Sequence, residues 1–134
     1  MSKLEIQSID HIVMQAGDVA ATVKFYTEIL GMTHQVFQPP TGGSARQSLH
    51  FGAQKINLHD SQAPYTPHAA HPVAGSVDLC FISEQPIAGW QAHFAAHGIA
   101  IEEGPVRKTG ACGALMSLYI RDPDQNLIEI SNYI

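Results

Sequence analysis

Apolar and polar residues alternate in the first half of the chain in an order that predicts one strand, one helix and three further strands. The first strand would turn Ile12 and Met14 toward the helix and His11 toward the opposite face. Asp18 precedes a run of apolar residues at helical spacing and is the expected N-cap of the helix. The predicted elements are a strand at 8–14, a helix at 19–30 and strands at 33–37, 46–51 and 54–59.

The same order of elements returns after a proline-containing linker at residues 61–75. The second set comprises a strand at 76–82, a helix from Pro86 to Gly98, a short strand at 99–102, a glycine-rich loop at 104–113 and a hairpin of strands at 115–120 and 127–131. The sequence therefore predicts an α+β fold of two tandem βαβββ modules, in one domain spanning residues 1–134. Module one would cover about residues 6–60 and module two about residues 76–134.

The repeat places polar residues at equivalent strand positions. His11 aligns with Asp78 in the first strand of each module, and Asn57 aligns with Glu129 in the last strand. If the modules pack about a pseudo-twofold axis, their polar faces would close one shared cavity in a curved mixed sheet. We then expect His11, Asp78 and Glu129 to meet there, with Asn57 or His59 as a fourth donor.

This donor set is typical of a divalent metal site. One imidazole, two carboxylates and one further donor suit a borderline or hard ion, with positions left open for water or substrate. The same residues could instead have purely structural roles. His11 could be a hydrogen-bonded core histidine and Asp78 an acceptor at a cavity wall. The carboxylate of Glu129 could form an ion pair with a basic residue. The candidates for that pair are Arg46, Lys55 and Arg121.

Composition narrows the class of protein. The chain has 134 residues, of which 45% are hydrophobic and 14% charged, as expected for a compact domain. The net charge of −5 argues against nucleic acid or an anionic membrane as partner. No apolar run reaches the length of a membrane span, and the start of the chain lacks the apolar stretch of a signal peptide. Only Cys80 and Cys112 occur, so we expect a reducing, cytoplasmic location.

Three stretches of the chain resemble the vicinal oxygen chelate superfamily, in addition to the paired βαβββ order. They are DHIVM around His11, FYTEILGM in the first helix, and DPDQNLIEIS around Glu129. That superfamily includes glyoxalase I, fosfomycin-resistance proteins, extradiol dioxygenases and bleomycin-binding proteins. The stretches KINLH and TGACG are most similar to the branch of glyoxalase domain-containing protein five, whose bacterial members are often called virulence proteins.

The resemblance implies roles for individual residues. The metal ligands would be His11, Asn57, Asp78 and Glu129, with His59 as the alternative to Asn57. The superfamily usually has His, Glu or Gln at the middle two positions, so Asn57 and Asp78 depart from its pattern. The bound ion would be Zn, Ni, Mn, Fe or Co. The candidate substrate-binding residues are His50, Tyr119, Arg46 and Arg121.

The implied function is a metal-dependent lyase or isomerase of the glyoxalase type, acting on a small oxygenated substrate such as a thiol adduct. The metal would stabilise a developing enediolate and Glu129 would act as base. Two alternatives are a metal-free protein that binds a small molecule or antibiotic, and a thiol transferase of the fosfomycin-resistance type. A homodimer is expected, with the cavity completed within one chain or across the dimer.

Overall fold

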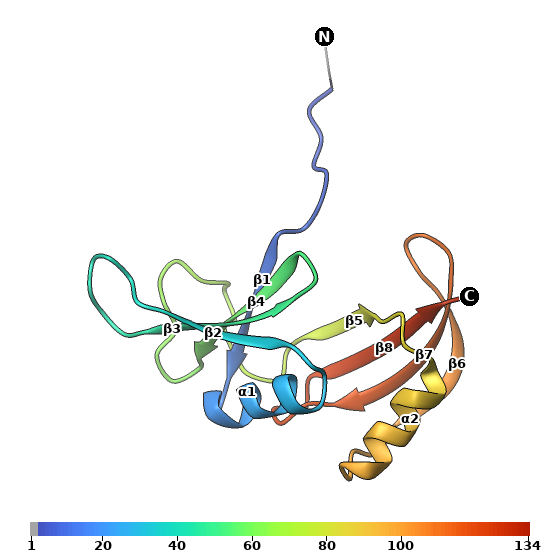
Figure 1. Cartoon of the computed structure of the whole chain (residues 1–134). Coiled ribbons are helices and arrows are strands. Elements are labelled where there is room, and N and C mark those ends of the chain that lie inside the picture. Colours follow the sequence, from blue (N-terminus) through green and yellow to red (C-terminus); the bar gives the residue numbers. More distant parts are fainter. Residues whose placement is uncertain (1–2) are drawn as a thin grey trace.

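The computed structural model describes residues 3–134 and contains two βαβββ modules in tandem, as predicted (Figure 1). The elements are β1 His11–Ala16, α1 Val19–Glu28, β2 Thr33–Phe37, β3 Arg46–Phe51, β4 Gln54–Asp60, β5 Asp78–Ile82, α2 Ile87–Ala96, β6 Glu103–Thr109, β7 Ala114–Arg121 and β8 Leu127–Tyr133. Within the described residues, neither helix has the length and apolar content needed to cross a membrane.

Each module forms a mixed sheet of four strands with the same topology. The strand order is β1-β4-β3-β2 in module one and β5-β8-β7-β6 in module two. The first and last strands of each module are parallel neighbours, and the remaining pairs are antiparallel. This identity of topology confirms the internal repeat, and it places β4 and β8 in equivalent central positions.

The first helix begins where the sequence predicted. Asp18 caps it, because its carboxylate accepts a hydrogen bond from the backbone N–H of Ala21 at 3.0 Å. Phe25 and Tyr26 are buried beneath the helix against the sheet. The helix ends at Glu28, slightly earlier than predicted, and the chain then turns through Gly31, whose φ of +73° is unfavourable for other residues.

The second strand of module two differs from the prediction. Residues 99–102 lie outside the strand, and β6 occupies Glu103–Thr109, within the predicted glycine-rich loop. A β-bulge between Glu103 and Val106 accommodates Gly104 and Pro105 on this edge strand. A Cβ atom at Gly104 would collide with the backbone oxygen of Ser117 in β7. Glycine and proline therefore permit the strand here, although the sequence pattern indicated a loop.

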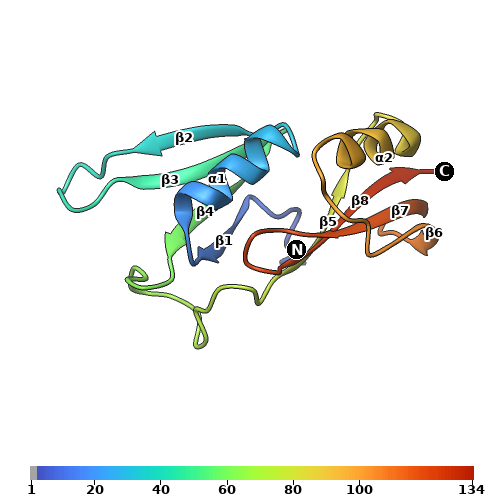
Figure 2. The same cartoon turned by 90° about the horizontal axis from the view of Figure 1, so that it is seen from below.

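The two modules pack against one another through the sides that carry their helices. Phe51 of module one and Phe81 of module two make an edge-to-face contact with ring centroids 5.2 Å apart. His93 Nε2 of α2 lies 2.8 Å from the backbone oxygen of Ile29, just after α1. Figure 2 shows the two sheets side by side, with α1 next to the first and α2 next to the second. Buried residues of both modules form one hydrophobic cluster. The two sheets are not closed into one, so the chain alone does not form the predicted shared cavity.

The turn between β7 and β8 is hydrogen-bonded to α1 of module one. Asp122 in this turn is 2% exposed and accepts hydrogen bonds from the backbone N–H groups of Asp124 and Asn126, each at 2.9 Å. The Asn126 amide donates to the same carboxylate at 2.8 Å, and the Tyr26 hydroxyl of α1 donates at 2.7 Å. A buried carboxylate is stable here because four donors replace its water shell.

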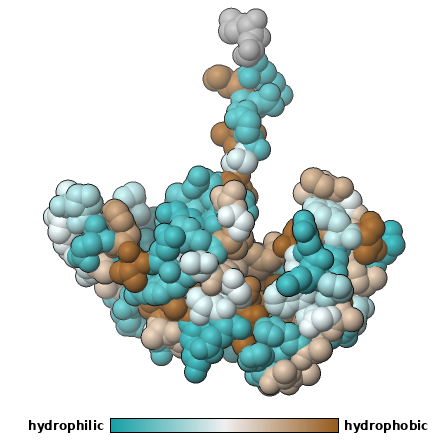
Figure 3. Space-filling model, in the orientation of Figure 1, coloured by the Kyte–Doolittle hydropathy of each residue, from teal (hydrophilic) through white to brown (hydrophobic). Residues whose placement is uncertain are grey.

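An extended arm precedes β1 and stands away from the rest of the protein (Figures 1 and 3). Leu4 and Ile6 in this arm are 96% and 91% exposed. Single exposed apolar residues are common, but two of them in an arm of extended backbone form a surface suited to a partner.

The hydrogen bond between Tyr26 and Asp122 is expected to stabilise the joint between the modules. Tyr26→Phe removes one donor from a buried carboxylate and should lower the free energy of unfolding by about 1–3 kcal/mol. Urea unfolding followed by circular dichroism measures this change. Tyr65→Phe is the control, because the Tyr65 hydroxyl is exposed and its bonds to backbone oxygens are 3.4 Å long. An equal loss in both variants would contradict the assignment.

Candidate functional site

The side of each sheet that faces away from its helix carries the polar residues. In β4, Ile56 and Leu58 are buried in the core, and the residues between them lie on the polar face. In β8, Ile128 and Ile130 are buried and flank Glu129 in the same way. This alternation confirms the faces predicted from the sequence. The predicted site residues on the polar faces are His11, Arg46, His50, Asn57 and His59 in module one, and Asp78, Tyr119, Arg121 and Glu129 in module two.

Glu129 occupies the centre of the polar face of module two. Its Oε2 accepts hydrogen bonds from the hydroxyls of Ser117 and Ser131, at 2.6 and 3.2 Å. Both serines are fully buried, and their hydroxyl oxygens are 2.7 Å apart. Among residues 3–134 Glu129 forms no salt bridge, and Arg121 is paired with Glu102 at 2.9 Å instead. The carboxylate is thus held by neutral hydroxyls and has no cation beside it.

A phenol and a thiol flank this carboxylate on the neighbouring strands. Tyr119 and Cys80 are the cross-strand partners of Glu129 in β7 and β5. Burial, together with the negative charge of Glu129, raises the pKa of Tyr119 to about 12. Burial also raises the pKa of the Cys80 thiol, against the opposing effect of its 3.4 Å contact with the Ser131 hydroxyl. At neutral pH the face therefore presents a carboxylate between two protonated groups.

His11 and Asp78 lie at the starts of β1 and β5. His11 Nδ1 is 2.7 Å from the Asp10 carboxylate, and the two side chains are 42% and 87% exposed. A histidine whose Nδ1 proton is donated to a carboxylate leaves Nε2 free to accept a proton or a metal. Asp78 is exposed and makes no side-chain hydrogen bond within residues 3–134. The core-histidine interpretation of His11 is therefore wrong.

The predicted metal donors do not come together in one chain. Across residues 3–134, no three His, Cys, Asp or Glu side chains are grouped closely enough to share an ion. His11 and Glu129 belong to separate sheets that are not closed on one another, and Glu129 Oε2 is already bonded to two serines. The donors of a single chain therefore do not fit a metal ion in this arrangement.

Basic and neutral residues form a second polar cluster on module one. A cavity of about 180 Å³ is lined by Arg46, Ser48, Lys55, Asn57 and His59 with neighbouring residues. Within the described part of the chain, neither Arg46 nor Lys55 forms a salt bridge with a carboxylate. This face therefore carries two cations that have no salt-bridge partner among the described residues.

His50, predicted to bind substrate, and His59, predicted as a metal ligand, have different surroundings. The Nε2 atom of His50 lies 2.9 Å from the Ser48 hydroxyl. His59 packs edge-to-face on Tyr65, with ring centroids 4.8 Å apart, and its Nδ1 is buried without a hydrogen-bond partner. Burial lowers the pKa of His59, and the positive charges of Arg46 and His68 lower it further. His59 is therefore a neutral imidazole at neutral pH.

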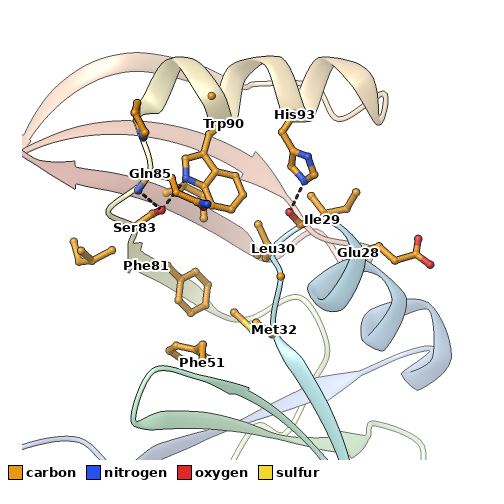
Figure 4. Close-up of a pocket in the computed structure, with 15 residues that line it drawn as sticks. Glu28, Ile29, Leu30, Met32, Phe51, Phe81, Ser83, Gln85, Trp90 and His93 are labelled. Carbon is orange, nitrogen blue, oxygen red and sulfur yellow. Dashed lines mark hydrogen bonds between the residues drawn. The ribbon is translucent and has the colours of Figure 1, made fainter.

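A further cavity lies on the helix side, between the modules (Figure 4). Its volume is about 760 Å³, and Phe51, Phe81, Met32 and Trp90 form much of its apolar wall. The Trp90 indole N–H donates to the Ser83 hydroxyl at 2.9 Å, so one edge of the ring is fixed. Trp90 is partly buried, because it packs against the core and also lines this groove.

Comparison with known proteins assigns the family. The family model of the Glyoxalase/Bleomycin resistance protein/Dioxygenase superfamily matches residues 8–130. The chain belongs to this superfamily. Virulence protein STM3117 of Salmonella typhimurium is 48% identical over 129 residues, which cover 96% of this chain and 86% of that protein. Its crystal structure matches with a TM-score of 0.89 at 46% identity, over 98% of this chain and 100% of that chain.

Two further relatives carry glyoxalase names. Glyoxalase domain-containing protein RDO1 of Mycosarcoma maydis is 47% identical over 131 residues, which cover 98% of this chain and 71% of that protein. The crystal structure of lactoylglutathione lyase from Agrobacterium tumefaciens matches with a TM-score of 0.69 at 25% identity, over 96% of this chain and 95% of that chain. The resemblance to the glyoxalase superfamily noted from the sequence is thereby confirmed.

Several residues of this superfamily domain that surround the candidate site were not singled out from the sequence. Ser117 and Ser131 hold Glu129, and Cys80 lies beside it. On module one, Gln15 is 8% exposed on the polar face. The two-residue alternation that located Glu129 also places these side chains on the polar faces. What it could not supply is the pairing of strands, which decides which polar residues are neighbours.

The contact between Tyr119 and Glu129 can be tested by titration. The tyrosine stabilises the folded state below its ordinary pKa of about 10, and this contribution is lost as the pH rises through about 12. Glu129→Gln should lower the pKa of Tyr119 toward the ordinary value. The pKa should stay above that value, because the effect of burial remains. Ultraviolet difference titration measures it, and Tyr119→Phe identifies the signal. An unchanged Tyr119 titration in Glu129→Gln would refute the contact.

Proposed function

We propose that this protein is a glyoxalase-type lyase or isomerase that acts on a small oxygenated substrate at the polar face around Glu129. The observation that carries the proposal is a partly buried carboxylate that is held by Ser117 and Ser131 and forms no salt bridge within residues 3–134. A carboxylate positioned in this way can act as a general base. The relatives named glyoxalase domain-containing protein and lactoylglutathione lyase support the same class of reaction.

The proposed step is a proton transfer between neighbouring carbons. Glu129 takes the proton from a carbon that bears a hydroxyl or thiol adduct beside a carbonyl group, and the electron pair moves to the carbonyl oxygen. The protonated Tyr119 and Cys80 next to Glu129 are placed to donate hydrogen bonds to that oxygen as its charge develops. Glu129 then returns the proton to the former carbonyl carbon. The hydroxyl of the first carbon becomes the new carbonyl group and its proton passes to the oxyanion, so no oxidant or reductant is consumed.

A second copy of the chain would complete this site. The polar face of module one carries Arg46 and Lys55, and neither forms a salt bridge within residues 3–134. On the polar face of module two, Glu129 and Asp78 also form no salt bridge within these residues. These unpaired charges, the free edges of β1 and β5, and the exposed arm before β1 favour pairing of module one of one copy with module two of another.

We propose that the predicted divalent ion binds only in this dimer. Pairing of the two faces would bring His11 of one copy toward the carboxylates of the other, which a single chain does not achieve. The free Nε2 implied by the bond between His11 and Asp10 suits such a ligand. No step of the proposed reaction is assigned to the ion.

Loss of the Glu129 carboxylate should abolish the proposed reaction. Glu129→Gln keeps the size of the side chain and its capacity to accept from the serines, and removes the base. We expect kcat to fall by about 10²–10⁴-fold with the hemithioacetal of methylglyoxal and glutathione. Glu84→Gln, an exposed change in the loop before α2, is the matched control. Parallel assays with fosfomycin and thiols test the transferase alternative. Equal activity of Glu129→Gln and wild type would exclude Glu129 as the base.

Bound metal should be found in the dimer and should depend on His11. After incubation with Zn²⁺, Ni²⁺ or Mn²⁺ and removal of excess ion, elemental analysis of the dimer fraction should detect bound metal. His11→Ala should lose most of it, because a neutral imidazole contributes strongly to such sites. His97→Ala, an exposed histidine after α2, should retain it. Wild-type protein that stays free of metal would contradict the ion assignment.

A metal-free binding protein is the second candidate function. Two observations favour it: the described donors do not gather in one chain, and the groove between the modules has the volume and apolar lining of a small-molecule site. Binding of an apolar ligand that is weakened by Trp90→Ala, together with absence of metal and of turnover, would establish this function in place of the enzyme.

A further inference from the structure

The cavity on the polar face of module one brings two cations together. Arg46 and Lys55 line it with Ser48 and Asn57, and none of the residues within 3–134 that line it is an Asp or a Glu. The chain has seven Lys and Arg residues, against 12 Asp and Glu. Two of the seven therefore converge on one small space whose described wall contains no acid.

The pairing of β3 and β4 explains how the two cations meet. Ser48 and Asn57 are direct cross-strand partners, and both line the cavity. Arg46 lies two residues before Ser48 and Lys55 two residues before Asn57, so the four side chains share one face of the sheet. Because the strands are antiparallel, the two cations lie on opposite sides of the pair formed by Ser48 and Asn57.

An aromatic ring holds Arg46 in place. The guanidinium carbon lies 4.4 Å from the centroid of the Tyr65 ring, which is a cation–π contact. Tyr65 in turn packs against His59, with ring centroids 4.8 Å apart. Unlike a carboxylate, the ring does not neutralise the guanidinium charge or accept two parallel N–H bonds from it. Arg46 is therefore positioned and still able to bind an oxyanion.

The ammonium group of Lys55 is also available to a ligand. Lys55 forms no salt bridge within residues 3–134. Asp10 lies near it, since the hydrogen bond with His11 and, more weakly, the charge of Lys55 lower the pKa of Asp10. The Asp10 carboxylate, however, contacts His11 at 2.7 Å. The acid closest to Lys55 in charge effect is thus bonded to another residue.

Charge and volume together select the kind of anion. A phosphate monoester carries a charge of about −1.5 to −2 at pH 7, which matches two cations, whereas a carboxylate carries a single negative charge. Its three oxygens can meet cations on two sides and the donors of Ser48 and Asn57 on a third. The cavity volume of about 180 Å³ equals that of roughly six water molecules. This space suits a phosphoryl group with a short carbon chain.

We propose that this cavity binds the phosphoryl group of a small molecule. The guanidinium of Arg46 and the ammonium of Lys55 hold the phosphoryl oxygens from opposite sides, and the Asn57 amide donates a hydrogen bond between them. All of these residues belong to module one. Binding therefore requires neither Glu129 nor the reaction proposed above, and either proposal can fail without the other.

Three simple anions test the proposed chemistry. Inorganic phosphate and methyl phosphate carry the phosphoryl group, and acetate carries a carboxylate in its place. Titration of the ¹⁵N-labelled full chain at constant ionic strength should shift the signals of the Asn57 side-chain amide and Arg46 Nε. We expect both phosphates to bind at least about tenfold more tightly than acetate, which corresponds to about 1.4 kcal/mol.

Single substitutions test the two cations. Arg46→Gln and Lys55→Gln each remove one positive charge and keep a polar side chain, and each should weaken binding of methyl phosphate by at least about tenfold. Lys24→Gln makes the same change of charge at an exposed position of α1 and should bind as wild type does. Glu129→Gln should also retain binding, which separates this site from the proposed enzyme activity.

Three results would overturn the proposal. They are equal affinity for methyl phosphate and acetate, no response of the Asn57 amide up to about 10 mM phosphate, and undiminished binding in either Arg46→Gln or Lys55→Gln. If wild type binds no phosphate and both variants lose the dimer in sedimentation experiments, the two cations serve the contact between copies instead.

Discussion

The packing of the two modules through their helix-bearing sides is the constraint on which the remaining structure depends. Three contacts join the modules into one core. They are the ring contact between Phe51 and Phe81, the hydrogen bond between His93 and the backbone after α1, and the hydrogen bond between Tyr26 and Asp122. Burial of this apolar surface is the dominant stabilising term, and it leaves both polar faces outside. A cavity shared by both polar faces would require a different packing, which the chain alone does not adopt.

This packing separates two surfaces with different chemistry. Around Glu129 a carboxylate, a phenol with a raised pKa and a protonated thiol lie on three adjacent strands. On module one, the cations Arg46 and Lys55 lie beside Asn57 and His59. The structure of a single chain therefore holds the proposed general base, and its described donors do not form a metal site.

The superfamily accounts for the fold and leaves the chemistry to individual residues. Asn57 is equivalent by the repeat to Glu129, yet the first has a side-chain amide and the second a carboxyl group. The serines that hold Glu129 are buried, so they fix its orientation without adding charge.

The sequence by itself determined the order of elements, the repeat and the face on which each polar residue lies. These properties depend on local periodicity, so His11, Asn57 and Glu129 were placed correctly on polar faces. It missed the course of β6, because a bulge opposite the neighbouring strand β7 accommodates Gly104 and Pro105. Only the tertiary structure decided that the two sheets do not close into one, that Ser117 and Ser131 hold Glu129, and that the linker lies next to Gln15. These features depend on which strands pair and how the modules pack, which periodicity does not encode.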